Sequence, residues 1–480
     1  MDRKIVVSSL IWRFAERCGA QGVSFIVGLV LARLLSPEDY GLIAIVSVFT
    51  TFLNVFIDSG MGGALVQKKN ADDIDYSSVF YFNVAFSVIL YLAFFFASPW
   101  FASLYDASEL VPVFRVMGTT FLISGIKNIQ IAKIQSSMAF KQFFYANLGG
   151  TVISAVVGIT FAYLGFGVWA LVAQSLISNL FGAVVLWIAV KWKPKWTFSF
   201  KRLKGLLSYG WKMMASSLIS TGYSDIWQLI IGILYSPTVL AFYNRGNHMP
   251  NLVIKNINST IDIVLFPAMS KTQDEKDKLK AMTRRSIKTS TYIMAPLLLG
   301  LAAVSEPVVK VLLTDKWLPC VTFMQIFCIV YVFYPLTTAN HNALKAMGRS
   351  DLVLKLEIAK SIFGLVALLV TMKFGVLAIS FGFLATNLFT QFIKAYPNKK
   401  LMGYSYLEQL KDILPSIALA TAMAVIVGLV MLLKLSPIVT LFIQVPLGAI
   451  IYIVGSWIFK LDSFTYILSI LKDFTKKKKA

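Results

Sequence analysis

Six polar side chains recur through an otherwise apolar stretch at residues 238–267, at spacings of 4, 3, 4, 3 and 4 residues. They are Asn244, His248, Asn251, Lys255, Asn258 and Asp262. These spacings place all six on one side of a helix, and such a polar stripe cannot face lipid. Amide, imidazole and ammonium groups could hydrogen-bond a polar solute in a water-filled path. The alternative is a packed polar interface between helices.

The preceding apolar stretch carries a second polar stripe. Its members are Ser217, Thr221, Ser224 and Gln228, with Asp225 beside them. Small hydroxyl residues suit close helix packing as well as a polar path, so both interpretations stay open. Asp225 is a candidate to bind a coupling cation or proton, or alternatively to pair with Arg245 or Lys255.

The composition excludes a soluble protein. Of the 480 residues, 57% are hydrophobic and 14% charged, and the mean hydropathy is +0.73; soluble domains have about 45–50% apolar and about 25% charged residues. A soluble fold could not bury this much apolar surface, so the chain is not a cytoplasmic enzyme, a nucleic-acid binder or a disordered protein. Three cysteines (Cys18, Cys320 and Cys328) lie in apolar stretches and predict neither disulfides nor a metal site.

We therefore predict an all-α polytopic membrane protein. A window of about 20 residues yields fourteen candidate spanning helices. They lie near residues 9–35, 40–60, 77–102, 109–134, 142–164, 167–190, 210–234, 238–267, 286–313, 319–346, 352–373, 376–396, 412–434 and 438–460. The first is interpreted as a retained helix and not as a signal peptide, since no small-residue cleavage site follows it.

The distribution of cations predicts the orientation of the chain. The odd-numbered gaps between predicted helices hold about five cations, whereas the tails and even-numbered gaps hold about thirty. Cytoplasmic loops collect Lys and Arg, so both termini are predicted to be cytoplasmic. The same rule accounts for the net charge of +22.

Two features recur along the chain. Ser36-Pro37 and Ser236-Pro237 are 200 residues apart, and Val111-Pro112 and Leu318-Pro319 about 207. We therefore predict two parallel six-helix lobes, a transporter architecture whose substrate site lies between the lobes. The predicted divisions are 1–190 for the first lobe, 191–208 for a basic interfacial linker helix, 209–400 for the second lobe, and 401–480 for helices 13 and 14 with a basic cytoplasmic tail.

A set of motifs within residues 5–415 carries a family resemblance. In order they are Phe25–Ser47 (FIVGLVLARLLSPEDYGLIAIVS), Phe56–Gly60, Gln67–Lys69, Asp75–Asn83, Gly165–Leu171, Tyr243–Arg245 with Pro250-Asn251, Glu306-Pro307, Lys316–Pro319 and Gly348–Asp351. Together they resemble the polysaccharide transporter family, and most closely its Wzx-type flippases for colanic and teichuronic acid. That family belongs to the multidrug/oligosaccharidyl-lipid/polysaccharide superfamily.

The resemblance implies a flippase of the bacterial cytoplasmic (inner) membrane. Such proteins are believed to move undecaprenyl-diphosphate-linked oligosaccharides across the membrane by alternating access, for exopolysaccharide, capsule or lipopolysaccharide biosynthesis. The implied partners are the lipid-linked oligosaccharide, membrane lipids, and a polysaccharide polymerase with its chain-length machinery; nucleic acid is not among them. No catalytic residue, metal or cofactor is expected.

A diphosphate cargo would require cations at membrane depth, where an unpaired charge costs about 2.5–3.5 kcal/mol. The candidate substrate-binding residues are Arg13, Arg17, Lys127, Arg245, Asn251, Lys255 and Asn258, and the coupling-ion candidates are Asp225, Asp262 and Glu16. Arg17 could instead pair with Glu16, and Arg13 departs from the family pattern. Lys127 and the polar group Asn340–Lys345 are predicted to line facing sides of one cavity.

Two further predictions concern other charged residues. Glu357 and Lys360 should pair with each other, and Asp72, Asp73 and Asp75 should form a loop and helix cap instead of a metal site. A cation-coupled exporter of drugs or other small amphiphiles is the main alternative, but it predicts a cavity dominated by acids. A membrane polymerase or ligase would need a reactive cluster on an outer loop, and these loops are short and lack histidine.

Overall fold

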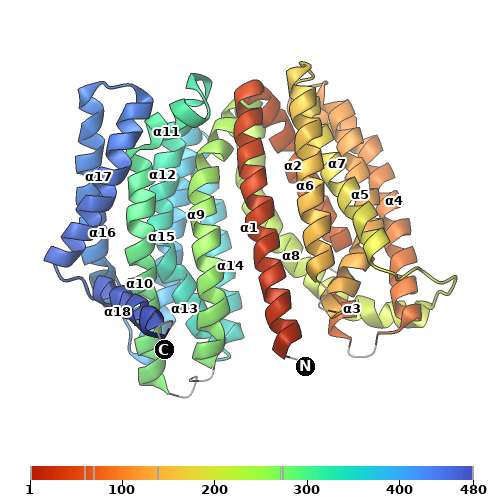
Figure 1. The fold of residues 1–480 in the computed structure, drawn as a ribbon. Coiled ribbons are helices and arrows are strands. Elements are labelled where there is room, and N and C mark those ends of the chain that lie inside the picture. Colours follow the sequence, from red (N-terminus) through yellow and green to blue (C-terminus); the bar gives the residue numbers. More distant parts are fainter. Residues whose placement is uncertain are drawn as a thin grey trace. The chain divides into compact units, whose positions relative to one another are not determined.

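The computed structural model describes residues 3–58, 61–68, 71–137, 140–270, 272 and 275–477. The side chains of residues 3–18, 67, 137, 140–143, 209, 259–264, 266–268, 350 and 470–477 lie outside that description. Every regular element in the described ranges is a helix, which confirms the all-α class (Figure 1).

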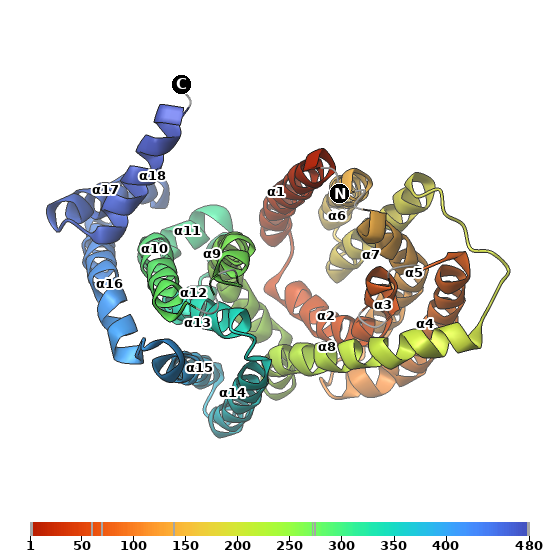
Figure 2. The ribbon, with the colours of Figure 1, turned by 90° about the horizontal axis from the view of Figure 1, so that it is seen from below.

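The chain divides into two compact units, Met1–Ala241 and Phe242–Ala480. The helices of the first unit are α1 (Arg3–Leu34), α2 (Pro37–Asp58), α3 (Met61–Gln67), α4 (Asp73–Ser103), α5 (Leu110–Ser137), α6 (Phe140–Tyr163), α7 (Val168–Ala189) and α8 (Phe200–Leu234). In this unit α8 packs along α2 and α3 (Figure 2). The contacts of α8 therefore assign it to the first unit. The lobe boundaries, which were inferred from the internal repeat, stay a prediction.

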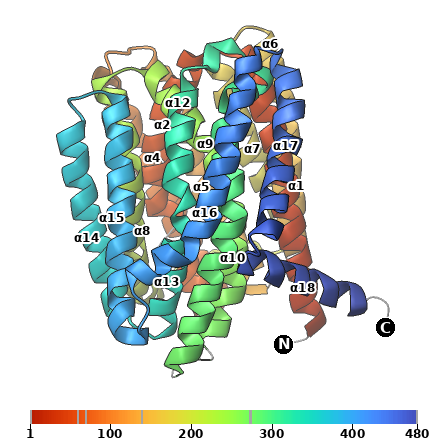
Figure 3. The same cartoon turned by 90° about the vertical axis from the view of Figure 1, so that its left-hand side faces the viewer.

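The second unit starts within α9 (Pro237–Ser270). Its other elements are α10 (Lys276–Ala303), α11 (Ser305–Leu312), the 3₁₀ turn η1 (Asp315–Trp317), α12 (Cys320–Val332), α13 (Tyr334–Ala346), α14 (Ser350–Thr371), α15 (Val376–Met402), α16 (Tyr406–Leu429), the 3₁₀ turn η2 (Val430–Leu433), α17 (Pro437–Ile458) and α18 (Asp462–Lys477). Figure 3 shows α16 and α17 side by side, with α18 turning away from the end of α17.

Each of the fourteen predicted segments falls on a helix, but two of them are interrupted. The segment 286–313 is divided into α10 and α11, which bend by 69° at Val304. The segment 319–346 is divided at Phe333, because Pro335 supplies no amide hydrogen to continue the helix. Among the described residues, nine helices are long and apolar enough to cross a membrane, or ten with the bent pair.

The prediction of a helical linker is wrong for residues 191–199, which form an irregular segment with a bend at Trp196. This segment is tied to the first turns of α4: the amide of Lys195 donates to Ser77 Oγ at 3.0 Å, and the amide of Ser199 donates to Ser78 Oγ at 2.9 Å. Both serines are fully buried. The hydrogen bonds that a helix would form internally are made here to α4 instead, and the helix starts only at Phe200.

The acidic group at the start of α4 is a helix cap, as predicted. Asp72 accepts hydrogen bonds from the amides of Ile74 and Asp75, and the Asp75 side chain accepts one from the Asp72 amide. Arg202 of α8 also donates to Asp72. That hydrogen bond, followed by the one from the Asp75 amide, lowers the pKa of Asp72 to about 2. The cap and the ion pair together fix the start of α8 against α4.

The basic tail contains a helix that the sequence analysis did not predict. Helix α18 starts at Asp462, whose carboxylate pairs with Lys288 of α10 at 2.5 Å. The guanidinium of Arg285 lies 3.6 Å from the ring centre of Tyr466. Helix α10 thereby orients the first turns of α18.

Candidate functional site

One side of α9 is packed tightly against α12. The ring of Tyr243 lies 5.9 Å from the ring of Phe323 and 5.1 Å from the ring of Phe327. At Gly246 a Cβ atom would come within 2.6 Å of Phe323 Cβ and 2.8 Å of the Cys320 carbonyl oxygen. Only glycine permits this approach of the two backbones.

The opposite side of α9 carries the predicted polar stripe. His248 and Lys255 are exposed, and Asn244 and Asn251 are half-buried. The four residues are spaced by 4, 3 and 4, so they form one continuous row along the helix. The packing against α12 orients this row away from the interior of the second unit.

The charges along this row are positive. Arg245 and Lys255 both act electrostatically on His248. The guanidinium of Arg245 also lies 5.0 Å from the ring centre of Trp317, within the range of a cation–π interaction. Trp317 is fully buried, so it holds the Arg245 stem in a defined position. The row therefore presents neutral hydrogen-bonding groups and the Lys255 cation to the space beside it, and Arg245 lies at its edge, against Trp317.

The row ends before Asn258. This residue is 7% exposed, and neither its amide oxygen nor its amide nitrogen has a hydrogen-bond partner among the described residues. The expectation that Asn258 lies on the same open surface as Asn251 is thus not met. The Asp262 side chain lies outside the described residues.

Cysteine labelling should separate the two sides of α9. Asn251→Cys and Lys255→Cys should react rapidly with a small membrane-impermeant maleimide, because their side chains lie on the open row. Ile254→Cys serves as the control, since Ile254 is 5% exposed and packs inside the unit. The measurement is the labelled fraction over time in intact cells. Equal protection of all three cysteines would show that the row is a dry interface.

Lys127 lies inside the first unit. Its Nζ donates to Asn179 Oδ1 of α7 at 3.0 Å, and its charge interacts with Asp58. Asp58 in turn accepts a hydrogen bond from Asn128. Lys127 thus has two polar partners of its own, and its role as a substrate ligand stays a prediction.

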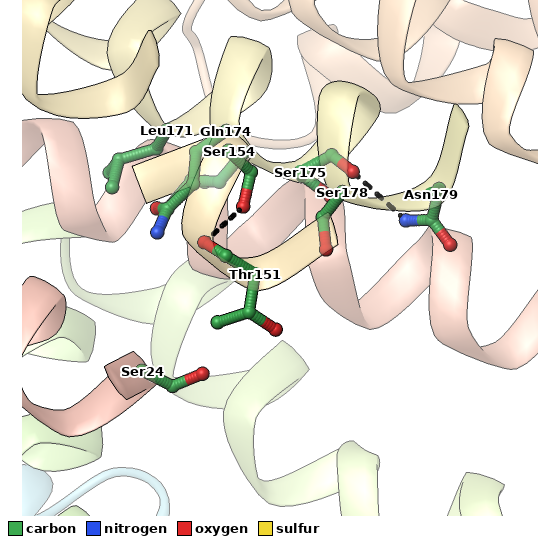
Figure 4. A pocket seen from close by; sticks show the side chains of 9 residues that line it. Ser24, Thr151, Ser154, Leu171, Gln174, Ser175, Ser178 and Asn179 are labelled. Atoms are coloured by element: carbon green, nitrogen blue, oxygen red, sulfur yellow. Dashed lines mark hydrogen bonds between the residues drawn. The ribbon is translucent and has the colours of Figure 1, made fainter. Parts of the chain in front are cut away.

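Beside Lys127 the first unit contains a polar cavity of about 320 Å³ (Figure 4). Its lining comes from α1, α2, α6 and α7, and consists of Ser24, Ile43, Thr151, Ser154, Leu171, Gln174, Ser175, Ser178 and Asn179. The sequence analysis did not single out these residues, because serines and threonines in a spanning helix suit close packing equally well. The available signal was the row of polar positions 174, 175, 178 and 179, which fall on one face of a helix.

Small residues of α6 set the shape of this cavity. Gly150 and Gly158 flank Ser154 at intervals of four residues, and a Cβ at either glycine would lie 3.0 Å from an atom of α7. Such spacing lets two helices pack closely at membrane depth. The polar side chains of α7 are therefore held against α6 over the middle of both helices.

Of the other predicted site residues, the structure describes the side chain of Asp225 but not those at the start of α1. The side chains of Arg13, Glu16 and Arg17 lie outside the described residues. Asp225 is half-buried; its Oδ1 accepts a hydrogen bond from Ser224 at 3.4 Å, and its Oδ2 has no partner in the described part of the chain. A carboxylate oxygen with spare capacity is compatible with cation binding.

Two polar clusters of the second unit are satisfied by their own hydrogen bonds and ion pairs. Asn340 is fully buried, donates to Gln409 Oε1 at 2.7 Å and accepts from Asn398 Nδ2 at 2.7 Å. It joins α13 to α16 and α15 and does not line a cavity, which corrects the prediction for this residue. The predicted Glu357–Lys360 pair is confirmed at 3.2 Å, and Lys394 joins it at 2.8 Å.

A sequence profile of the family described as polysaccharide biosynthesis protein matches residues 30–322. The chain belongs to this family. The matched region runs from the end of α1 to the start of α12, so the polar row of α9 and every lining residue of the cavity except Ser24 lie within it.

Curated relatives in this family are transport and biosynthesis proteins. The chain is 26% identical over 318 residues to the succinoglycan biosynthesis transport protein ExoT of Rhizobium meliloti, covering 66% of this chain and 64% of the relative. It is 26% identical over 312 residues to the teichuronic acid biosynthesis protein TuaB of Bacillus subtilis, covering 63% of each. The match thus spans slightly less than two thirds of the length of these relatives.

The fold of this family member is that of a known flippase. A structure of the lipid II flippase MurJ, in an inward closed conformation, superposes with a TM-score of 0.74 at 15% identity. The alignment covers 94% of this chain and 98% of MurJ. At this identity the likeness establishes the fold and not the cargo.

Proposed function

We propose that the chain is a flippase that moves undecaprenyl-diphosphate-linked oligosaccharide units across the bacterial cytoplasmic membrane by alternating access. The observation that carries this proposal is the row of donors and cations on α9. Such a row would cost free energy against lipid, whereas beside a diphosphate it replaces lost hydration with charge-assisted hydrogen bonds. Membership in the polysaccharide biosynthesis family supports a saccharide cargo.

The proposed transport needs no chemical step. Arg245 and Lys255 would bind the diphosphate, Asn251 would bind adjoining oxygens, and the polyprenyl chain would stay in lipid. Asp225 is our candidate for a coupling cation. The product would be delivered to a polysaccharide polymerase and its chain-length machinery.

An exporter of cationic drugs fits the row less well. A cationic cargo requires carboxylates or aromatic rings to replace its hydration. The charges recorded around His248 are positive instead, and they would repel such a cargo.

Purified protein in liposomes tests the function. A fluorescent short-chain polyprenyl diphosphate carrying N-acetylglucosamine should cross the bilayer at least tenfold faster with the wild type than with Arg245→Ala or without protein. A cationic dye loaded into the same liposomes serves as the comparison. Transport of the dye without transport of the glycolipid would overturn the proposal in favour of a drug exporter.

We further propose fourteen spans with both termini in the cytoplasm. Reporter fusions after Lys204 and after Lys280 should then be cytoplasmic, and a fusion at Pro37 should be external, because the basic segments mark the inner side. Paired alkaline phosphatase and fluorescent-protein fusions measure the location. An external signal after Lys204 would reverse the proposed orientation.

A further inference from the structure

The cavity of the first unit has hydrogen-bonding groups but no charge in its lining. Hydroxyl and amide side chains from three helices, α1, α6 and α7, line it (Figure 4). The apolar residues Ile43 and Leu171 complete the lining. Its volume of about 320 Å³ falls in the range of about 300–1,000 Å³ in which small ligands bind.

Several of these groups have hydrogen-bonding capacity left over. Among the lining residues drawn in Figure 4, no hydrogen bond joins the side chain of Ser24, Gln174 or Ser178 to a neighbour. Thr151 and Ser154 donate to helix carbonyls, to Asn147 O at 2.8 Å and Thr151 O at 3.0 Å, so that their oxygens remain available as acceptors. The cavity can therefore donate and accept hydrogen bonds at once, as a ring bearing several hydroxyls requires.

Among the described side chains, the cation Lys127 reaches the cavity lining only through Asn179. Lys127 Nζ donates to Asn179 Oδ1, and Asn179 Nδ2 donates to the Ser175 carbonyl at 3.0 Å. Asn179 is thus held in place and screens the ammonium group from the cavity. An anion would find no charge partner in the lining, and a metal ion would find no carboxylate.

The cavity lies near the middle of two apolar helices, α6 and α7. Ser154 lies in the middle of the apolar segment Phe144–Tyr163, and Ser175 lies near the middle of Val168–Ala189. Hydroxyl and amide groups at this depth are costly unless water or a polar ligand satisfies them. The neighbouring Gly150 and Gly158 keep α6 and α7 packed, so the wall of the cavity that these two helices form is fixed.

We propose that this cavity is a binding subsite for one neutral sugar ring of the cargo. The apolar side chains of Ile43 and Leu171 would contact the C–H face of the ring, while Gln174, Ser178 and Ser24 would bind its hydroxyls. The inference rests on the proposed flippase function. It separates recognition of the sugar, in the first unit, from recognition of the diphosphate on α9.

The test compares two probes on the purified full-length protein: a short-chain polyprenyl diphosphate, and the same lipid carrying one glucose, galactose or N-acetylglucosamine. In the wild type at least one sugar should raise the affinity about tenfold, the effect of a few neutral hydrogen bonds. Gln174→Leu/Ser178→Ala should abolish this gain and leave the affinity for the bare lipid unchanged. Thr160→Val is the matched control, because this exposed α6 hydroxyl lies outside the cavity.

An equal gain in the wild type and the double variant, or no gain with any of the three sugars, would overturn the inference. If the double variant is unstable by thermal melting, Ser178→Ala alone should still reduce the gain several-fold. Failure of the bare lipid to bind would count against the flippase function instead. The cavity is then judged separately: methyl glucoside should protect Ser178→Cys from maleimide, and an absence of protection would refute the subsite.

Discussion

Changing Arg245 to glutamate should abolish export of the surface polysaccharide, and changing it to alanine should impair export strongly. Two unit charges about 4 Å apart at an effective dielectric constant of about 20 interact by about 4 kcal/mol before desolvation. A net contribution of about 1 kcal/mol already changes occupancy several-fold. Arg245→Lys should retain part of the function, because it keeps the charge but loses the planar stacking on Trp317. Arg17 should follow the same order if it contributes to the same anion site.

The measurement is exported polysaccharide normalised to membrane-inserted protein. Lys373→Glu is the control, because it reverses a charge in the turn between α14 and α15 and not on α9. Normal export by Arg245→Ala at wild-type abundance would remove Arg245 from the site. Rescue by exchanging Arg245 with an acidic partner would assign it to a structural ion pair.

Removal of the Glu357 carboxylate should destabilise the second unit. The side chain of Lys394 is only 6% exposed and pairs with Glu357, which also binds Lys360. Glu357→Gln would leave the Lys394 ammonium group buried without its counter-ion. Breaking a fully buried pair costs about 3–5 kcal/mol; because the Glu357 side chain is 38% exposed, we expect a smaller loss of about 2 kcal/mol after solvent screening.

The thermal unfolding temperature of the detergent-solubilised protein measures this loss. Lys360→Gln is the matched control and should have a smaller effect, since the Lys360 side chain is 29% exposed. The double variant Glu357→Leu/Lys394→Met should recover most of the stability, because it removes both charges. An unfolding temperature of Glu357→Gln equal to that of the wild type would show that the pair contributes nothing.

Long apolar segments made the helices predictable, because a spanning helix must satisfy its own backbone hydrogen bonds. The breaks at Val304 and Phe333 were not predicted, since hydropathy continues through both positions. Helix α18 was missed for the opposite reason: its alternation of apolar and charged residues falls below any spanning threshold. The irregular segment 191–199 depends on Ser77 and Ser78, more than 110 residues away, and no local pattern contains that pairing.

The candidate site could be predicted from the sequence where polar or charged residues recur at helical spacing. The α9 row followed from the positions of Asn244, His248, Asn251 and Lys255, and the structure places them on one side. Burial of Asn258 depends on tertiary packing and could not be inferred from the same spacing. The hydroxyl-lined cavity was missed because serines on α6 and α7 are equally suited to close packing. Only the three-dimensional arrangement shows which of them face an open space.

The contact at Gly246 has a mechanical consequence. With no side chain between them, the backbones of α9 and α12 are interlocked, and a relative slide of one along the other would drive Gly246 into Phe323. A force applied to the α9 side chains is therefore transmitted to α12 as a whole, instead of being absorbed by bending of a single helix. A cargo bound to α9 would then move α9 and α12 together as a rigid pair. Binding of the cargo and movement of these helices would be coupled.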